Sequence, residues 1–316
     1  MTRVVCIGEC MVELRAVGTD NFVRGYAGDV YNTAVYLKRS LPEARVQFLT
    51  GTGDDAMSRA MRTAWHAEGI DDTLAFTVNG GSPGLYLIEN DTRGERRFQY
   101  WRSNSAARRW LELLRGQDEA VLWGADVIYL SGISLAILSR EERIGAVELL
   151  RRLRSRVGRI AFDPNVRLRL WEAPQAAAET IEAAFSIADI ALPSTEDVRT
   201  LLHIDDPAEQ VNRLQGFGVR EVALTLGADG CLIADGEART RLPAPSVESV
   251  TDSSGAGDAF NGAYLAARLA GGSAVEAARS GLLVGSRVIV HAGAVVPASV
   301  SHPTVPAVTC LPAQHD

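Results

Sequence analysis

Six short apolar runs, each about the length of one β-strand, are spaced along the chain, and amphipathic helical stretches separate most of them. The runs are Val4–Ile7, Val46–Thr50, Val127–Leu130, Ile160–Phe162, Ile190–Leu192 and Val222–Thr225. Continuous apolar runs are typical of strands buried on both faces, and an intervening helix lets the next strand run in the same direction. The alternation therefore predicts an α/β fold with a mostly parallel central sheet flanked by helices.

Two insertions with strand-like patterns interrupt this alternation. They contain Met11–Ala16 and Phe22–Tyr26, and then Leu74–Val78, Gly84–Glu89 and Arg96–Trp101, joined by turns with Gly, Asn and Asp. Each insertion is too small to hold a core of its own. We expect them, at about 10–27 and 73–103, to form a small antiparallel β lid over the main sheet. An apolar face on this lid predicts a homo-oligomer assembled through the lid.

The overall composition narrows the class of protein. With 316 residues the chain is long enough for one α/β domain, and we expect residues 1–316 to form it. No apolar run reaches membrane-spanning length, and Met1–Gly8 enters a strand pattern without a signal peptide, so we expect a cytoplasmic protein with no membrane partner. The net charge of −7 disfavours a nucleic-acid partner.

Lysine is nearly absent, because Lys38 is the only lysine among 32 Lys and Arg residues. A phosphate-binding loop of the Gly-x-x-x-x-Gly-Lys type is therefore excluded, as is a strand lysine of the protein-kinase kind. Any phosphate bound by this chain must be neutralised by backbone amides, arginine or a metal ion.

The segment Gly255-Ala256-Gly257-Asp258 leads directly into a helical pattern, in which Phe260, Ala263, Tyr264 and Ala267 share one face. Free amides and the helix dipole attract anions at such an N-terminus. Asp258 would then lie beside a bound phosphate, where a carboxylate can accept a proton from an attacking hydroxyl. Taken alone, the motif fits an ordinary helix N-terminus equally well.

Other polar segments carry weaker signals. Gly28, Asp29 and Asn32 could bind a polyol or cap a helix. Gly51–Ala56 resembles a dinucleotide fingerprint, but its two carboxylates would repel a pyrophosphate, so a turn with a capping Asp is favoured. Thr225–Gly230 could lie against a nucleotide, but taken alone a simple hairpin turn is favoured.

Two arginines are placed to hold an anionic substrate. Tyr100 and Arg102 share one face of a lid strand, with Tyr86 expected on the neighbouring strand. Arg167 follows the strand Ile160–Phe162, at the carboxyl edge of the sheet where open α/β folds bind ligands. Taken alone, each arginine is more readily interpreted as an ordinary surface residue.

Together these segments resemble the ribokinase-like PfkB family of carbohydrate kinases, and within it the kinases of 2-keto-3-deoxygluconate. The segments on which this resemblance rests are Ile7-Gly8-Glu9, Gly28-Asp29 with Asn32, Tyr100-Trp101-Arg102 with Ser105-Ala106-Ala107, Asp163–Arg167 with Leu170-Trp171, Pro193–Asp197, Thr225–Gly230 and Asp252–Asp258. The similarity spans nearly the whole chain. Ser194, Asp197 and Leu226 stand where many relatives carry Asn, Glu and Lys.

The resemblance implies a role for each candidate residue. Asp258 would be the catalytic base, with the amides of Gly255, Ala256 and Gly257 as the anion hole. The implied substrate contacts are Gly28, Asn32, Tyr86, Tyr100, Arg102, Arg167 and Asp258. The implied ATP contacts are Asn165, Ser194, Thr225, Gly227, Gly230, Gly255 and Gly257. Asp197 would contact Mg²⁺ through water, and Asp252 would lie near a monovalent cation such as K⁺.

The implied reaction is phosphorylation of 2-keto-3-deoxygluconate to its 6-phosphate by ATP and Mg²⁺. A substrate with a carboxylate needs local arginine in an acidic protein, which favours the sugar acid over a neutral sugar. The alternatives are a neutral-sugar kinase of the fructokinase or ribokinase type, and a non-catalytic sugar-binding protein that kept the fold.

Overall fold

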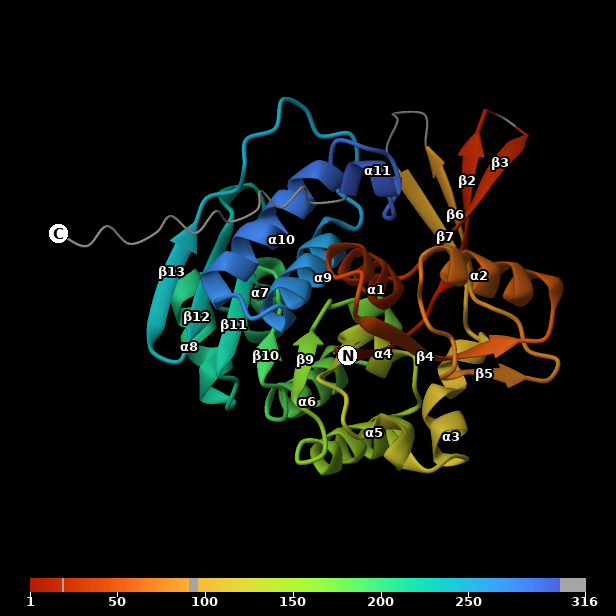
Figure 1. Cartoon of the computed structure of the whole chain (residues 1–316), viewed down its shortest axis with the longest axis horizontal. Coiled ribbons are helices and arrows are strands. Elements are labelled where there is room, and N and C mark those ends of the chain that lie inside the picture. The colour runs from red at the N-terminus through yellow and green to blue at the C-terminus, as the bar shows by residue number, and fades with distance from the viewer. Residues whose placement is uncertain (19, 91–95, 302–316) are drawn as a thin grey trace.

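The computed structural model describes residues 1–18, 20–90 and 96–301, in which a large sheet lies between two helical layers and a small sheet stands at one end (Figure 1). The strands are β1 (Arg3–Ile7), β2 (Met11–Val17), β3 (Asn21–Ala27), β4 (Arg45–Gly53), β5 (Ala75–Val78), β6 (Leu85–Asn90), β7 (Arg96–Trp101), β8 (Val127–Ser131), β9 (Arg159–Asp163), β10 (Ile190–Ala191), β11 (Glu221–Thr225), β12 (Cys231–Asp235) and β13 (Ala238–Leu242). The α-helices are α1 (Asp29–Ser40), α2 (Ala56–Ala67), α3 (Trp110–Arg115), α4 (Gly132–Ala136), α5 (Arg140–Leu153), α6 (Pro174–Phe185), α7 (Thr195–Leu202), α8 (Pro207–Gly216), α9 (Ala256–Leu269), α10 (Ala274–Val288) and α11 (Ala298–Ser301). Short 3₁₀ helices are η1 (Ala106–Arg109), η2 (Glu119–Leu122), η3 (Leu168–Leu170) and η4 (Gly227–Asp229).

The main sheet has the order β13-β12-β11-β10-β9-β8-β1-β4-β5 within the described residues. All neighbours from β11 to β5 run parallel, whereas β12 and β13 close one edge as an antiparallel pair. The six strands predicted from apolar runs are β1, β4, β8, β9, β10 and β11, which confirms the predicted fold class. In β1 the side chains of Val4, Val5, Cys6 and Ile7 are all fully buried, as expected for a strand covered on both faces.

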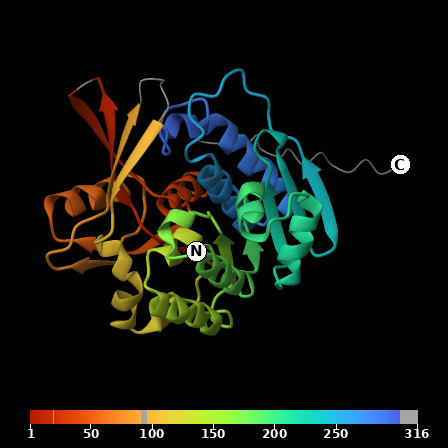
Figure 2. The same cartoon turned by 180° about the vertical axis from the view of Figure 1, so that it is seen from behind.

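Each face of the main sheet is covered by its own group of helices, seen from opposite sides in Figures 1 and 2. Helices α1, α2, α9 and α10 pack on one face around Phe48, Trp65 and Tyr264. Helices α3 to α8 pack on the other face around Trp110, Phe162 and Phe185. This three-layer packing leaves the carboxyl ends of the parallel strands free to carry a site.

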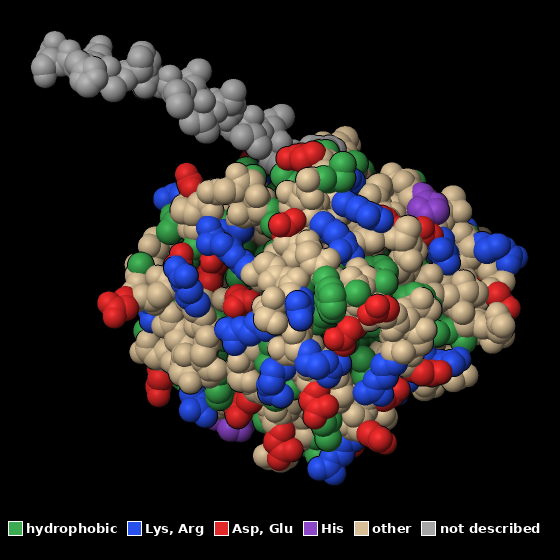
Figure 3. Space-filling view, turned by 60° about the horizontal axis from the view of Figure 1, so that its bottom comes forward, with side chains coloured by type: hydrophobic (Ala, Val, Ile, Leu, Met, Phe, Trp, Pro, Cys, Tyr) green, Lys and Arg blue, Asp and Glu red, His purple; other side chains and the backbone are tan. Residues whose placement is uncertain are grey.

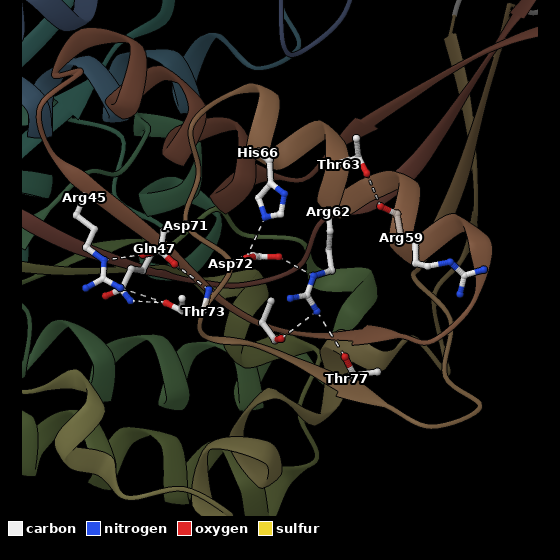
Figure 4. A network of polar contacts seen from close by, with 11 residues as sticks. Arg45, Gln47, Arg59, Arg62, Thr63, His66, Asp71, Asp72, Thr73 and Thr77 are labelled. Atoms are coloured by element: carbon white, nitrogen blue, oxygen red, sulfur yellow. Dashed lines mark hydrogen bonds and ion pairs between the residues drawn. The ribbon is translucent and has the colours of Figure 1, made fainter.

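The prediction that Leu74–Val78 joins the lid is wrong, because β5 pairs in parallel with β4 at the edge of the main sheet. Helix α2 makes the crossover between these two strands and is tied to the segment before β5. Arg62 donates to Asp72 at 2.7 Å, and Arg45 of β4 donates to Asp71 at 2.5 Å (Figure 4). Asp55 caps α2 by accepting from the Ser58 amide, as the capping interpretation of this turn predicts.

The small sheet has the order β3-β2-β6-β7 and stands apart from the main layers at the upper right of Figure 1. It consists of two antiparallel hairpins, β2–β3 and β6–β7, joined by a parallel β2–β6 pair. This confirms a separate small lid sheet. Residues 19 and 91–95 of the predicted lid and 302–316 of the predicted domain lie outside the described residues.

Across the described parts of the chain, no helix combines the length and apolar character that a membrane crossing requires. Basic and acidic side chains are interspersed over the face shown in Figure 3. Such mixing is typical of solvent-facing helices.

Candidate active site

A cavity of about 560 Å³ opens between the lid and the carboxyl ends of the main-sheet strands. It brings together segments from both ends of the chain. The predicted site residues that line it are Gly28, Asn32, Tyr86, Tyr100, Arg102, Asn165, Arg167, Ser194, Asp197, Thr225, Gly255, Gly257 and Asp258. Ala256, Gly227, Gly230 and Asp252 were also predicted but do not line the cavity wall. Asp29, which the sequence offered as a polyol contact or a helix cap, also lines the cavity. Lining residues to which sequence reasoning gave no role include Glu9, Asp163, Arg169, Glu196 and Asn261.

Asp258 lies in the first turn of α9 and faces this cavity. Its Oδ2 accepts a hydrogen bond from Nδ2 of Asn32 at 2.8 Å, which joins two segments 226 residues apart. Burial raises the pKa of Asp258 to about 7, and the negative charge of Asp29 adds to the rise, while Asn32 and Arg167 oppose it. A carboxylate with this pKa can accept a proton near neutral pH.

The turn before α9 is shaped by glycine. Gly255 has a φ of 75°, in the left-handed region, and a Cβ there would lie 2.5 Å from the carbonyl oxygen of Ala294. Only glycine fits such a position without strain. Gly257 is exposed, and among the described residues no atom outside its own turn lies within 4 Å of its Cβ position. Gly255 and Gly257 both line the cavity, so the N-terminus of α9 borders it beside Asp258, while the Ala256 amide donates to the Ser253 carbonyl at 3.3 Å.

Behind Asp258 lies a buried polar cluster centred on Asp163, at the carboxyl end of β9. Asn261 of α9 donates to its Oδ2 at 2.8 Å, and the amide of Asn165 donates to its Oδ1 at 2.9 Å. Burial raises the pKa of Asp163 well above its usual range, and the negative charges of Asp197 and Asp29 raise it further. Asp163 is therefore a structural anchor between β9 and α9.

Asp29 is the first residue of α1 and lines the same cavity, where its charge acts on both Asp163 and Asp258. Its Oδ2 accepts a hydrogen bond of 2.7 Å from Nδ2 of Asn165. Asn165 has a φ of 30°, an uncommon value for a residue with a side chain. The hydrogen bond and the special backbone conformation together fix a second carboxylate next to Asp258.

Arg102 is already engaged by a protein carboxylate. It forms an ion pair with Glu9, which is 2% exposed and also accepts a hydrogen bond from the Ser105 hydroxyl. The Nε and Nη2 atoms of Arg102 are buried. The predicted contact of Arg102 with the substrate is therefore limited to its remaining nitrogen, Nη1.

Aromatic rings cover the lid side of the cavity. Tyr100 stacks on Tyr86 with ring centroids 5.7 Å apart, and the Tyr86 hydroxyl donates to Glu13 of β2. The guanidinium of Arg169 lies over the Tyr100 ring, 4.3 Å from its centroid. These contacts join the lid to the segment that follows β9.

The side of the cavity expected to hold a nucleotide is built from helix caps and a hairpin. Ser194 and Asp197 form a reciprocal capping box at the start of α7, and Oδ1 of Asp197 also accepts from the Val166 amide at 2.7 Å. Gly227 and Gly230 lie in the turn of the antiparallel β11–β12 hairpin, at φ values of 61° and 92°. A Cβ on Gly230 would lie 2.0 Å from the Leu242 carbonyl oxygen, so backbone packing alone requires this glycine.

Asp252 is buried beneath the turn that precedes α9. Its Oδ1 accepts from the Ser254 amide at 2.9 Å, and its Oδ2 accepts from the Gly293 amide at 2.7 Å. Asp252 thus ties this turn to the loop after α10, and its predicted role near a monovalent cation stays a prediction.

Comparison with known proteins agrees with this geometry. The model of the pfkB family of carbohydrate kinases matches residues 1–300. The 2-dehydro-3-deoxygluconokinase of Escherichia coli strain K12 is 41% identical over 303 residues, covering 93% of this chain and 97% of that protein. The enzyme of the same name from Haemophilus influenzae is 34% identical, with 94% and 96% covered.

Among solved structures, a PfkB protein from Polaromonas sp. JS666 has a TM-score of 0.81 at 27% identity, covering 92% of this chain and 96% of that one. The chain therefore belongs to the pfkB family of carbohydrate kinases and has the ribokinase-like fold. It is a sugar kinase, which confirms the family and the enzyme class predicted from the sequence.

Proposed function

We propose that this protein transfers the terminal phosphoryl group of ATP to the primary 6-hydroxyl of 2-keto-3-deoxygluconate, the same compound as 2-dehydro-3-deoxygluconate. The observation that carries the proposal is the placement of Asp258 in the cavity, where Asn32 holds it at the N-terminus of α9. The relatives that are 41% and 34% identical carry the name of this activity. Arginines on the cavity wall complement an acidic substrate.

In the proposed mechanism Asp258 accepts the proton of the attacking hydroxyl as its oxygen bonds to the γ-phosphorus, and the bond from that phosphorus to the β–γ bridging oxygen breaks to release ADP. The amides of Gly255 and Gly257, and that of Ala256 once it leaves the Ser253 carbonyl, stabilise the charge that spreads over the transferred oxygens. No covalent enzyme intermediate is needed, because the hydroxyl attacks in line. Closure of the lid would exclude water and favour transfer to the sugar.

The residues on the nucleotide side fit a hydrated Mg²⁺ ion. Asp197 accepts three hydrogen bonds, from the amides of Val166 and Ser194 and from the Ser194 hydroxyl, and a carboxylate offers about four lone-pair sites. It can therefore accept one more from a metal-bound water, and Glu196 lines the same wall. Mg²⁺ usually keeps several waters in sites completed by phosphates, and when bound it neutralises phosphate charge.

The assay that tests this proposal offers the protein ATP and Mg²⁺ with a panel of sugar acids and neutral hexoses, and identifies products by mass. The panel contains the gluconate-type and galactonate-type keto-deoxy acids, fructose and ribose. We expect a mass gain of one phosphoryl group on the keto-deoxy acid. Preferential phosphorylation of fructose or ribose would establish a neutral-sugar kinase instead, and no sugar-dependent ATP consumption would indicate a binding protein.

A further inference from the structure

Arg169 is the cavity arginine to which sequence reasoning gave no role. It lies in η3, two residues after Arg167 and just beyond the carboxyl end of β9. Its side chain is exposed at the cavity wall rather than packed in the core. In the described part of the chain no ion pair joins Arg169 to an Asp or Glu, although its guanidinium has a defined position over the Tyr100 ring.

The contact with Tyr100 connects two parts of the fold. Tyr100 belongs to β7 of the lid, whereas Arg169 belongs to the segment that leaves the main sheet. A cation over an aromatic face at 4.3 Å is attracted by the ring, and the ring also holds the guanidinium plane in one orientation. Tyr100 is itself fixed by stacking on Tyr86. The planar edge of Arg169 is therefore oriented before any substrate enters.

Arg102 cannot supply an equivalent edge. Its charge is already balanced by Glu9, and its Nε and Nη2 atoms are buried. Two parallel hydrogen bonds to a carboxylate require two accessible N–H groups on one edge of the guanidinium. In this structure Arg102 offers at most one nitrogen, whereas Arg169 is an exposed residue with no protein acid paired to it among the described residues.

We infer that Arg169 is a further specificity-determining residue, which binds the carboxylate of the sugar acid and, through Tyr100, makes lid closure part of that recognition. The inference rests on the proposed function, since it assumes an anionic sugar. A bound carboxylate would accept hydrogen bonds from the edge of the Arg169 guanidinium, while the face of that guanidinium stays on the Tyr100 ring. An acid would thereby bind across the junction of lid and main sheet, and a neutral sugar would lack this bridge.

The first test compares Arg169→Met and Arg169→Lys with the wild type. Met removes the charge and the planar edge, and Lys keeps only a point charge. A charge-assisted pair contributes about 1.5–3 kcal/mol, so the KM for the keto-deoxy acid should rise about 10- to 100-fold in the Met variant. We expect kcat and the KM for ATP to change less than about threefold, and Lys to restore only part of the loss.

Arg159→Met is the matched control, because it removes the same charge at the opposite end of β9. Arg159 is exposed and is the first residue of β9, whereas the cavity lies at the carboxyl end of that strand. It should leave both KM values at the wild-type level. Equal rises in the KM for ATP and for the acid in the Arg169 variants would indicate a general disturbance of the loop and would overturn the inference.

The second test uses the methyl ester of the keto-deoxy acid, which has lost the negative charge. The wild type should prefer the acid over the ester in kcat/KM, and Arg169→Met should lose most of that preference. An unchanged preference would overturn the inference while leaving the proposed function intact. If the wild type itself failed to phosphorylate the acid, that result would refute the proposed function, and it would also refute this inference, which depends on that function.

Discussion

At the scale of single residues, the chemistry depends on the carboxylate of Asp258. We predict that Asp258→Asn lowers kcat by about 10²–10⁴-fold, because the amide cannot accept the hydroxyl proton. Asn32 can still contact the new side chain, so the fold should persist. Turnover of phosphoryl transfer and far-UV circular dichroism check both statements. Near-normal turnover would refute the role of Asp258, and Asp205→Asn, at an exposed ion pair, is the control.

The raised pKa of Asp258 predicts the pH dependence of the reaction. The base must be ionised, so kcat/KM should rise with pH and level off above about 7. Asp29 contributes to the raised pKa by like-charge repulsion. Asp29→Asn removes that repulsion, lowers the pKa of Asp258 and should move the acidic limb of the profile to lower pH. The same limb in both proteins, measured with saturating ATP, would contradict this electrostatic coupling.

The roles that could be predicted from the sequence belong to residues in short continuous motifs, and the remaining roles depend on contacts between residues far apart in the chain. Asp258 follows two glycines at a helix start, a pattern contained within four consecutive residues. Asp29 acquires its place in the site through Asn165, which lies 136 residues away. Likewise, the role that we propose for Arg169 depends on its contact with Tyr100 of the lid. A single sequence carries no signal for such pairs, because they arise from tertiary packing.

At the scale of elements, the start of α9 is the part that least tolerates change. We predict that Gly255→Ala lowers the free energy of unfolding by about 1–2 kcal/mol and reduces turnover, because the left-handed backbone and the Ala294 carbonyl both oppose a Cβ. Thermal unfolding and kcat measure the two effects. Gly216→Ala, at the end of α8 with open space around its Cβ, should be neutral or slightly stabilising. Equal effects of the two substitutions would contradict the argument.

The elements themselves were largely predictable, because buried parallel strands are continuous apolar runs separated by helices. The error at β5 has a physical origin. Residues 74–78 resemble the lid strands in length and in flanking turns, and sheet membership was decided by the α2 crossover and by the polar ties of Asp71 and Asp72. Strand pattern predicts that a segment is a strand, but the partner is set by long-range pairing.

At the scale of the whole molecule, the lid and the main sheet jointly form the cavity, with neither sufficient alone. Glu9 and Gly28 flank the β2–β3 hairpin of the lid, and a Cβ on Gly28 would lie 2.1 Å from the Glu9 carbonyl oxygen. This close approach brings the base of the lid against the start of α1. We therefore propose that residues 1–316 act as one domain, with the lid as an extension of it.

The lid leaves apolar side chains exposed on the face that carries Tyr86 and Tyr100. Val17 and Val23 are 51% and 48% exposed, and the register of β2 with β3 and β6 places them on that face. We predict that the protein is a homo-oligomer assembled through the lid, because burying such a face stabilises association. Light scattering coupled to size-exclusion chromatography should report a mass above the 33.9 kDa of one chain.

Replacing both valines in the double variant Val17→Glu, Val23→Glu should reduce the mass to that of one chain, because association would then bury two unpaired carboxylates. Val250→Glu is the control, since Val250 is 60% exposed and lies outside the lid. It should leave the mass unchanged. An oligomer that survived the lid substitutions but dissociated with Val250→Glu would place the interface elsewhere, and a monomeric wild type would remove the role of the lid in assembly.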